Sequence, residues 1–302
     1  MENELLVVSP SPHIRSKNTT QRIMLDVILA MLPMLVASVV IFGFRALAVV
    51  AVCVVSCAFF EWGFEKICKR ETTVGDLSAV VTGMLLAFNL PASIPLWQAV
   101  FGSLVAIVVV KQLFGGIGKN FANPAITARI VLLLSFAGSM SDFATKNDAI
   151  SSATPLSGGE MPTVLSLFLG THGGSLGETC ALAILLGGAY LLLRRVISWH
   201  TPVVMLATVA LLSFLLGESP VEQLLTGGLL LGAFFMATDY TTTPSTGWGK
   251  IVFGFGCGAI TVLIRVFGSY PEGVSFAILF MNILTPYIEI WTRRRPLGGA
   301  KK

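Results

Sequence analysis

The sequence predicts an all-α polytopic membrane protein with about ten transmembrane helices, arranged as two inverted five-helix repeats. Three observations predict this fold class. Of the 302 residues, 54% are hydrophobic and only 12% are charged, whereas soluble domains carry about 25% charged residues. The apolar residues form long runs, and the two halves of the chain resemble each other. This composition excludes an ordinary soluble enzyme.

Glycine, proline and charged residues divide the chain into apolar runs, and a spanning helix needs about 20 such residues. In order, the expected spans are 23–42, 46–60, 77–90, 96–114, 124–137, 179–193, 202–216, 221–237, 250–267 and 273–290. The runs that begin at Leu77 and Pro124 are short for a hydrocarbon core of about 30 Å. We therefore expect these two helices to be broken or buried inside the bundle.

An internal repeat relates the two halves of the chain. Residues 81–86 (VTGMLL) resemble residues 225–230 (LTGGLL), and the pattern of Trp and Gly over 97–115 resembles the pattern over 248–268. Each half then holds five spans. An odd number of spans makes the second copy insert upside down, as it does in many transporters.

Lysine and arginine predict the orientation, because they stay in short cytoplasmic loops. Seventeen of the 20 fall on the side of both termini, and only Arg45, Lys146 and Arg265 fall on the other side. The net charge of +4 is explained by these clusters and predicts no nucleic-acid partner. The expected regions are a cytoplasmic N-terminal segment, a first membrane repeat, an outer-side loop, a second membrane repeat and a basic cytoplasmic tail: 1–22, 23–137, 138–178, 179–290 and 291–302.

The cysteines and histidines predict no metal site. The five cysteines are single, without the paired spacing of a zinc or iron–sulfur site. The three histidines, His13, His172 and His200, lie outside the expected spans. No residue is assigned as catalytic in this chain.

The expected outer loop contains a run of small and polar residues, DAISSATPL at 148–156. By composition it is a surface loop. The run also resembles the flavinylation motif of the NqrB and RnfD family of membrane redox pumps, in which an Asp is followed by Ser or Thr, a small residue, Ala and Thr. Its ending is most similar to the RnfD branch of that family, and Ser152 stands where Gly is commonest.

The resemblance implies that Thr154 carries FMN through a phosphodiester bond, attached by a separate flavin transferase. It also implies that Asp148, Ser151, Ser152 and Ala153 complete the motif. A hydroxyl that attacks phosphorus needs an accessible loop and small neighbours, and the proline after Thr154 disfavours helix at that residue. We therefore expect covalent FMN on the outer side.

Two more segments resemble the same family, Asn-Pro-Ala at 123–125 and Met-Ala-Thr-Asp at 236–239. Asn123 before proline is typical of a helix N-cap, and such a helix start can hold an anion or the edge of a flavin. Arg129 and Asp239 are ionisable groups at or near the membrane boundary, where charge is costly. For Asn123 and Asp239 the alternative is a structural cap. The candidates for a second flavin site or an ion pathway are Asn123, Arg129, Thr238 and Asp239.

The resemblance implies a membrane electron-transfer subunit of an Rnf complex, which couples electron transfer between ferredoxin and NAD to Na⁺ or H⁺ translocation. It would not be catalytic alone. Its implied partners are other membrane subunits, iron–sulfur subunits and an NAD-binding flavoprotein, in a bacterial or archaeal cytoplasmic membrane. A non-covalent riboflavin is a second implied cofactor.

A different class of protein stays open at this point. The inverted five-plus-five plan also resembles urea and ammonium channels, so the chain could be a channel or transporter, or a structural scaffold without its own redox cofactor. Covalent flavin distinguishes the redox protein from both alternatives.

Overall fold

The computed structural model describes residues 19–143, 163–170, 172–268 and 273–293, and within these ranges every regular element is a helix. The first half of the chain contains two long helices followed by shorter ones. A turn at Gly43, whose φ of +76° favours glycine, reverses the chain between the long pair. The elements are α1 (Thr20–Phe42), α2 (Phe44–Ile67), η1 (Val74–Asp76), α3 (Ser78–Phe88), α4 (Leu96–Leu104), the π-helical η2 (Val105–Gln112), α5 (Pro124–Ser135) and α6 (Ala137–Met140).

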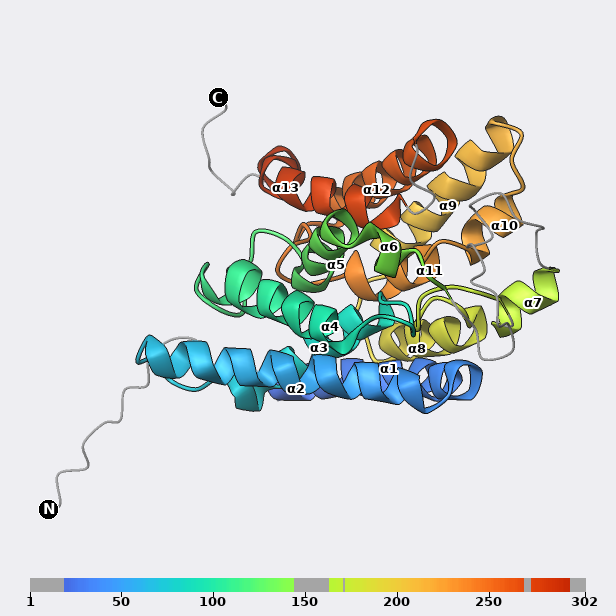
Figure 1. Ribbon diagram of the computed structural model, residues 1–302. Helices are drawn as coiled ribbons and strands as arrows, with labels where there is room; N and C mark the ends of the chain where they lie inside the picture. The colour runs from blue at the N-terminus through green and yellow to red at the C-terminus, as the bar shows by residue number, and fades with distance from the viewer. Residues whose placement is uncertain (1–18, 144–162, 171, 269–272, 294–302) are drawn as a thin grey trace, which may run out of the picture.

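The second half begins with shorter helices and ends with two long ones, so that the long pairs lie along opposite edges of the bundle in Figure 1. Its elements are α7 (Val164–Leu169), α8 (Ala181–Leu193), α9 (His200–Leu215), α10 (Pro220–Leu225), α11 (Leu229–Leu231), the π-helical η4 (Gly232–Met236), α12 (Gly247–Phe267) and α13 (Val274–Thr292).

Each expected span coincides with a helix or with a series of short helices. Among the described residues, α1, α2, α12 and α13 are long and apolar enough to cross a membrane, and five further apolar helices are shorter. The span expected at 221–237 contains α10, α11 and η4. Gly227 and Gly228, with φ values of +65° and +66°, separate α10 from α11, and η4 continues α11 directly as a π-helix. The all-α fold class is confirmed, while the ten spans and the inverted repeat stay predictions.

Helix α3 lies inside the bundle, as its short apolar run predicts. All of its residues except Val80 are buried. It approaches α2 closely at Gly83, where a Cβ atom would lie 2.7 Å from the Cα atom of Val54. With 11 residues, α3 is about 16 Å long and covers about half of a hydrocarbon core.

The last residue of α3 and the buried non-helical backbone after it pair with a segment of the other half. Phe88 and Leu90 accept backbone hydrogen bonds from Gly177 and Leu176, at 2.9 and 3.0 Å. Residues 172–179 are all buried, although the sequence suggests that 138–178 is an outer loop. Irregular backbone is tolerated at membrane depth where protein covers it, so the end of the expected loop belongs to the bundle interior.

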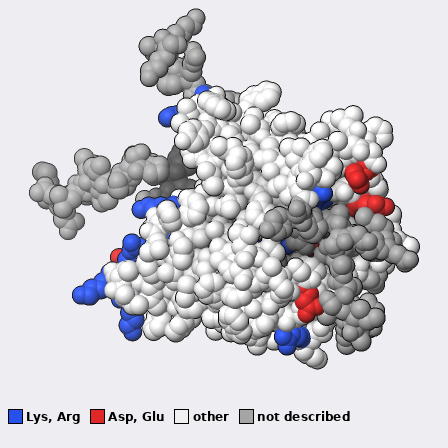
Figure 2. All heavy atoms as spheres, turned by 45° about the horizontal axis from the view of Figure 1, so that its top comes forward, with Lys and Arg blue, Asp and Glu red and all other residues white. Residues whose placement is uncertain are grey.

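On the face that Figure 2 shows, charged side chains avoid the middle of the surface. Figure 2 shows a broad band without Lys, Arg, Asp or Glu, with most of the visible basic side chains at one edge and the acidic ones mainly at the opposite edge. Helix α13 ends at the side of Figure 1 where the basic edge lies. Such a band is the surface expected for contact with lipid.

Two of the basic residues counted on the cytoplasmic side are buried inside helices. Lys111 lies in η2 and Arg129 in α5, and they are only 2% and 5% exposed. Their place inside helices agrees with the expected spans 96–114 and 124–137, and their burial means that polar partners must compensate both charges.

Candidate functional site

The proposed flavinylation motif lies outside the described residues. Asp148, Ser151, Ser152, Ala153 and Thr154 all fall within 144–162. Covalent FMN on Thr154 therefore stays a prediction, and the site that the structure describes is a cavity elsewhere in the bundle.

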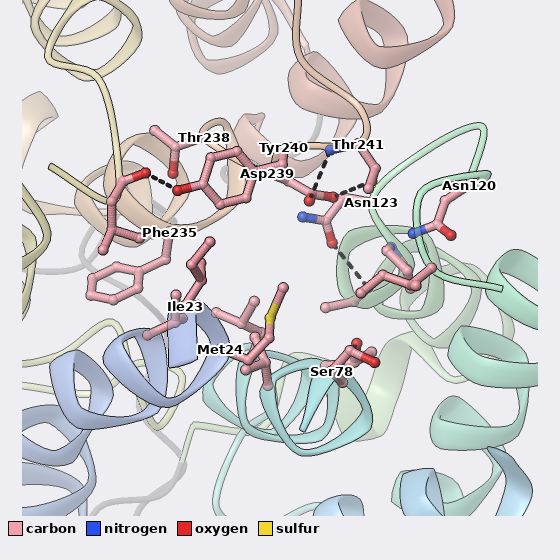
Figure 3. Close-up of a pocket in the computed structure, with 18 of the residues that line it drawn as sticks. Ile23, Met24, Ser78, Asn120, Asn123, Phe235, Thr238, Asp239, Tyr240 and Thr241 are labelled. Atoms are coloured by element: carbon pink, nitrogen blue, oxygen red, sulfur yellow. Dashed lines mark hydrogen bonds between the residues drawn. The ribbon is translucent and has the colours of Figure 1, made fainter. Parts of the chain in front are cut away.

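The cavity has a volume of about 300 Å³ and lies where the starts of α3 and α5 meet the end of η4. Helices α1 and α8, Lys111 of η2 and the loop residues Asn120 and Ile197 also line it. Figure 3 shows polar side chains, among them Asn123 and Asp239, along one side, and Ile23 and Met24 of α1 on the opposite side. Its main apolar residues are Ile23, Met24, Val27, Val81, Leu85, Leu191, Phe234 and Phe235.

Asn123 is the N-cap of α5, as the sequence predicts. Its Oδ1 atom accepts hydrogen bonds from the backbone N–H groups of Ala125 (3.0 Å) and Ile126 (3.4 Å). Its Nδ2 atom donates to the carbonyl oxygen of Met236 at 3.4 Å. Asn123 therefore fixes the start of α5 against the end of η4, and it lines the cavity between them.

Asp239 lies in the turn after η4 and also lines the cavity. Its carboxylate accepts hydrogen bonds from the backbone N–H of Thr241 (3.3 Å) and from the hydroxyls of Thr241 (3.1 Å) and Thr242 (3.2 Å). Burial raises the pKa of this carboxyl, and these hydrogen bonds oppose the rise. Asp239 thus caps a turn, as the structural alternative requires, and also faces the cavity.

Thr238 joins these residues, whereas Arg129 does not. The Thr238 hydroxyl donates to the carbonyl oxygen of Phe234 at 2.7 Å and lines the cavity. Arg129 lies further along α5, where its guanidinium donates to Ser275 Oγ at 2.8 Å and to Asn89 Oδ1 at 3.4 Å. The structure therefore brings three of the four candidate residues together and leaves Arg129 outside the wall.

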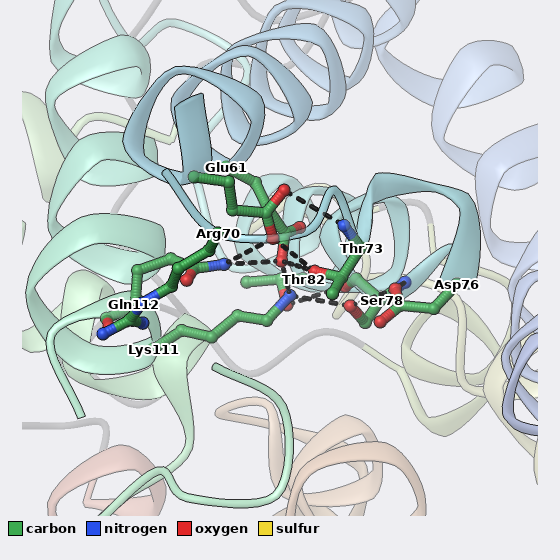
Figure 4. Close-up of polar contacts among 9 residues, drawn as sticks. Glu61, Arg70, Thr73, Asp76, Ser78, Thr82, Lys111 and Gln112 are labelled. Atoms are coloured by element: carbon green, nitrogen blue, oxygen red, sulfur yellow. Dashed lines mark hydrogen bonds and ion pairs between the residues drawn. The ribbon is translucent and has the colours of Figure 1, made fainter. Parts of the chain in front are cut away.

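Sequence reasoning missed a buried polar cluster on the cavity wall, which Figure 4 shows. The Lys111 ammonium lies 2.6 Å from Glu61 Oε1 and donates to Ser78 Oγ at 2.6 Å. Lys111 and Ser78 both line the cavity, and Glu61 is fully buried. The available signal was a lysine inside the apolar run 96–114, together with a glutamate directly after the run 46–60.

The cavity therefore has an apolar floor between walls of different polarity. Lys111, whose ammonium is paired with Glu61, lies on one wall. Asp239 provides an acidic group on another, with Thr238 and Asn123 beside it. An apolar pocket with a few convergent polar groups is the usual form of a small-molecule site. This arrangement suits a flat, mainly apolar ligand with hydrogen-bonding edges.

Comparisons with known proteins agree over nearly the whole chain. The model of the NQR2, RnfD, RnfE family matches residues 7–298. The D subunit of the Na⁺-translocating ferredoxin:NAD⁺ oxidoreductase complex of Acetobacterium woodii is 49% identical, over 99% of this chain and 98% of the relative. The D subunit of the proton-translocating ferredoxin:NAD⁺ oxidoreductase complex of Clostridium ljungdahlii is 38% identical, over 100% and 98%. The D subunit of an ion-translocating oxidoreductase complex of Halorhodospira halophila is 36% identical, over 96% and 95%.

Proposed function

Because this chain belongs to the NQR2, RnfD, RnfE family, we propose that it is the membrane electron-transfer subunit of an ion-translocating ferredoxin:NAD⁺ oxidoreductase complex. The observation that carries the proposal is the 49% identity to the Acetobacterium woodii protein over 99% of the chain. Of the relatives named above, one belongs to a complex that translocates Na⁺ and one to a complex that translocates protons. The proposal therefore includes ion coupling without assigning the ion.

The proposed electron carrier on the outer side is FMN on Thr154. In the attachment reaction, the Thr154 hydroxyl attacks the FMN phosphorus of FAD and forms a phosphodiester bond. The pyrophosphate bond breaks, AMP leaves, and the hydroxyl proton passes to a base of the flavin transferase. The motif at 148–156 supports this role, and so does the membership of the chain in a family of redox subunits.

The cavity is the proposed site of a second, non-covalent flavin such as riboflavin. Its volume of about 300 Å³ and its apolar floor fit an isoalloxazine ring. Asn120 Oδ1, on the wall, is buried and has no hydrogen-bond partner among the described residues. Asn123, Thr238 and Asp239 supply further polar atoms for the ribityl hydroxyls and the ring edge. When bound, a flavin supplies one- and two-electron chemistry, while the protein binds, orients and tunes it.

An inverted repeat is the proposed plan of the membrane domain. Two reciprocal contacts between α5 and α13 support it. Arg129 of α5 donates to Ser275 in the first turn of α13, at 2.8 Å. With its amide oriented to satisfy its neighbours, Asn282 of α13 accepts from the backbone N–H of Asn123 at the start of α5, at 3.1 Å. Each helix thus contacts the beginning of the other, as a two-fold axis in the membrane plane requires.

The experiment that tests the function is flavin fluorescence on a denaturing gel, with intact mass, for the chain expressed with and without a flavin transferase. We expect a fluorescent band with the added mass of FMN that requires the transferase. Thr154→Val should abolish it while the protein still accumulates in the membrane. Ser157→Ala is the matched control, because it removes another hydroxyl of the same segment and should leave the band unchanged.

Two outcomes would contradict this function. A dark, unmodified band in the presence of an active transferase would favour the channel or scaffold, and solute flux in liposomes would then distinguish those two. A band that stays fluorescent after Thr154→Val would mean that FMN is attached to another residue.

A further inference from the structure

The ammonium group of Lys111 is buried at the wall of the cavity. The side chain is only 2% exposed and extends from η2 to the first turn of α3 (Figure 4). An ammonium has three N–H donors. Among the described residues, Glu61 and Ser78 accept two of them. One donor is thus left for an acceptor in the cavity that Lys111 lines.

The surroundings of Lys111 hold it in this position. Glu61 Oε1 accepts both from Lys111 and from Gln112 Nε2, at 2.6 and 2.9 Å. Ser78 Oγ, which accepts from Lys111, donates to Asp76 Oδ1 at 2.5 Å. A buried charge held by a carboxylate and a hydroxyl is preorganised, so it costs little reorganisation when a nearby group changes its charge.

Lys111 is separate from the acidic group of the wall. Among the described residues that line the cavity it is the one cation, and its partner Glu61 is not part of the lining. The Asp76 carboxylate accepts from the backbone N–H of Ser78 at 2.8 Å, so the start of α3 adds no free positive charge. Asp239 belongs to a different segment of the wall, together with Thr238 and Asn123 (Figure 3). A ligand in this cavity therefore has one preferred direction for an edge that gains negative charge.

We propose that Lys111 faces the N1–C2=O edge of an isoalloxazine ring in this cavity and raises the reduction potential of that ring. The inference rests on the proposed function, because it requires a flavin in the cavity. Two electrons from the neighbouring redox carriers and one solvent proton, which binds at N5, reduce the ring and leave one negative charge over N1 and O2. An ammonium beside that edge stabilises the reduced ring relative to the oxidised one.

The test is a spectroelectrochemical titration of the full chain carrying Thr154→Val, which removes the proposed covalent FMN from the spectrum. We expect Lys111→Met to retain extractable flavin but to lower its midpoint potential. Binding of the reduced ring relative to the oxidised ring should fall by at least about tenfold, which is about 30 mV for a two-electron couple. Lys111→Arg keeps the charge and should stay close to the parent potential.

A second variant and a second measurement protect the test against misfolding. The double variant Glu61→Gln with Lys111→Met removes both charges of the pair and leaves no unpaired carboxylate. Its potential should still be lower than that of the parent, by less than in Lys111→Met alone. In the Thr154→Val chain with Lys111 intact, the absorption spectrum of the fully reduced flavin should be that of the anionic form at neutral pH. A neutral reduced spectrum would overturn the inference without any variant at this position.

The outcomes distinguish the role of Lys111 from the assignment of the cavity. If the Thr154→Val chain carries flavin and Lys111→Met leaves the potential unchanged, the role of Lys111 is wrong and the cavity keeps its proposed flavin. If the Thr154→Val chain carries no extractable flavin, the assignment of the cavity is wrong, and the role of Lys111 with it.

Discussion

At the scale of single residues, the cavity and its surroundings combine side chains that the sequence identifies as candidates with side chains whose contacts it does not predict. Asn123 directly before a proline is a local sequence pattern, and it correctly predicts the N-cap of α5, because N-capping depends on neighbours in the chain. Lys111 and Glu61 are 50 positions apart, and their contact depends on the packing of α2 against η2. Nothing local in the chain encodes that pairing.

Asp239 provides a prediction about coupling. Asp239→Asn keeps an oxygen that can accept from Thr241 but removes the negative charge that faces the cavity. We expect lower ion-coupled turnover of the complex in liposomes, with FMN still attached. Glu289→Gln is the matched control, because this half-buried carboxylate accepts from the exposed Ser245 and does not line the cavity. Unchanged coupled transport in Asp239→Asn would remove Asp239 from the ion pathway.

The same residue gives a prediction for pH. Burial raises the pKa of the Asp239 carboxyl in the folded protein above that of the unfolded chain. The folded state therefore binds the proton more tightly, so this group favours folding at low pH, and that contribution is lost as the pH rises through the raised pKa. The melting temperature of Asp239→Asn relative to the parent should be higher at about pH 8 than at about pH 4. A difference that does not change with pH would contradict this sign.

At the scale of elements, the apolar runs predict the helices well and their interruptions poorly. The short run at Leu77 predicts a buried helix, and α3 is one. The run 221–237 gives no comparable sign of its division into α10, α11 and η4, because glycines also occur inside continuous helices such as α12. The sequence also does not predict the burial of residues 172–179, since residues 176 and 177 of this segment pair with Phe88 and Leu90 in the other half of the chain.

Gly83 tests the packing of α3 against α2. A Cβ at this position would lie 2.7 Å from a backbone atom of Val54, so Gly83→Ala should push the helices apart and destabilise the protein by about 1–3 kcal/mol. Gly63→Ala in α2 is the control, because nothing lies within 4 Å of its added methyl group and helix propensity favours alanine. Thermal unfolding in detergent measures both. Equal melting temperatures for the two variants would refute the close contact.

At the scale of the whole molecule, the charge pattern predicts the orientation. Cys68 follows α2 and is exposed, whereas Cys53, Cys57 and Cys257 are buried. We expect a membrane-impermeant thiol reagent to label Cys68 in inside-out vesicles and not in right-side-out vesicles. Ser141→Cys in a Cys68→Ser background should give the reverse result, since Ser141 is exposed at the start of the expected outer loop. Labelling of Cys68 from the outside would invert the topology.

The backbone pairing of Phe88 and Leu90 with Gly177 and Leu176 also determines when the molecule can fold. During translation the first half emerges with these two carbonyl groups uncovered, and an uncovered carbonyl in the membrane interior is costly. Only the arrival of residues 176–177, after the segment that carries Thr154 has been synthesised, satisfies them. The two halves therefore complete their folding together, as one cooperative unit, and not one after the other.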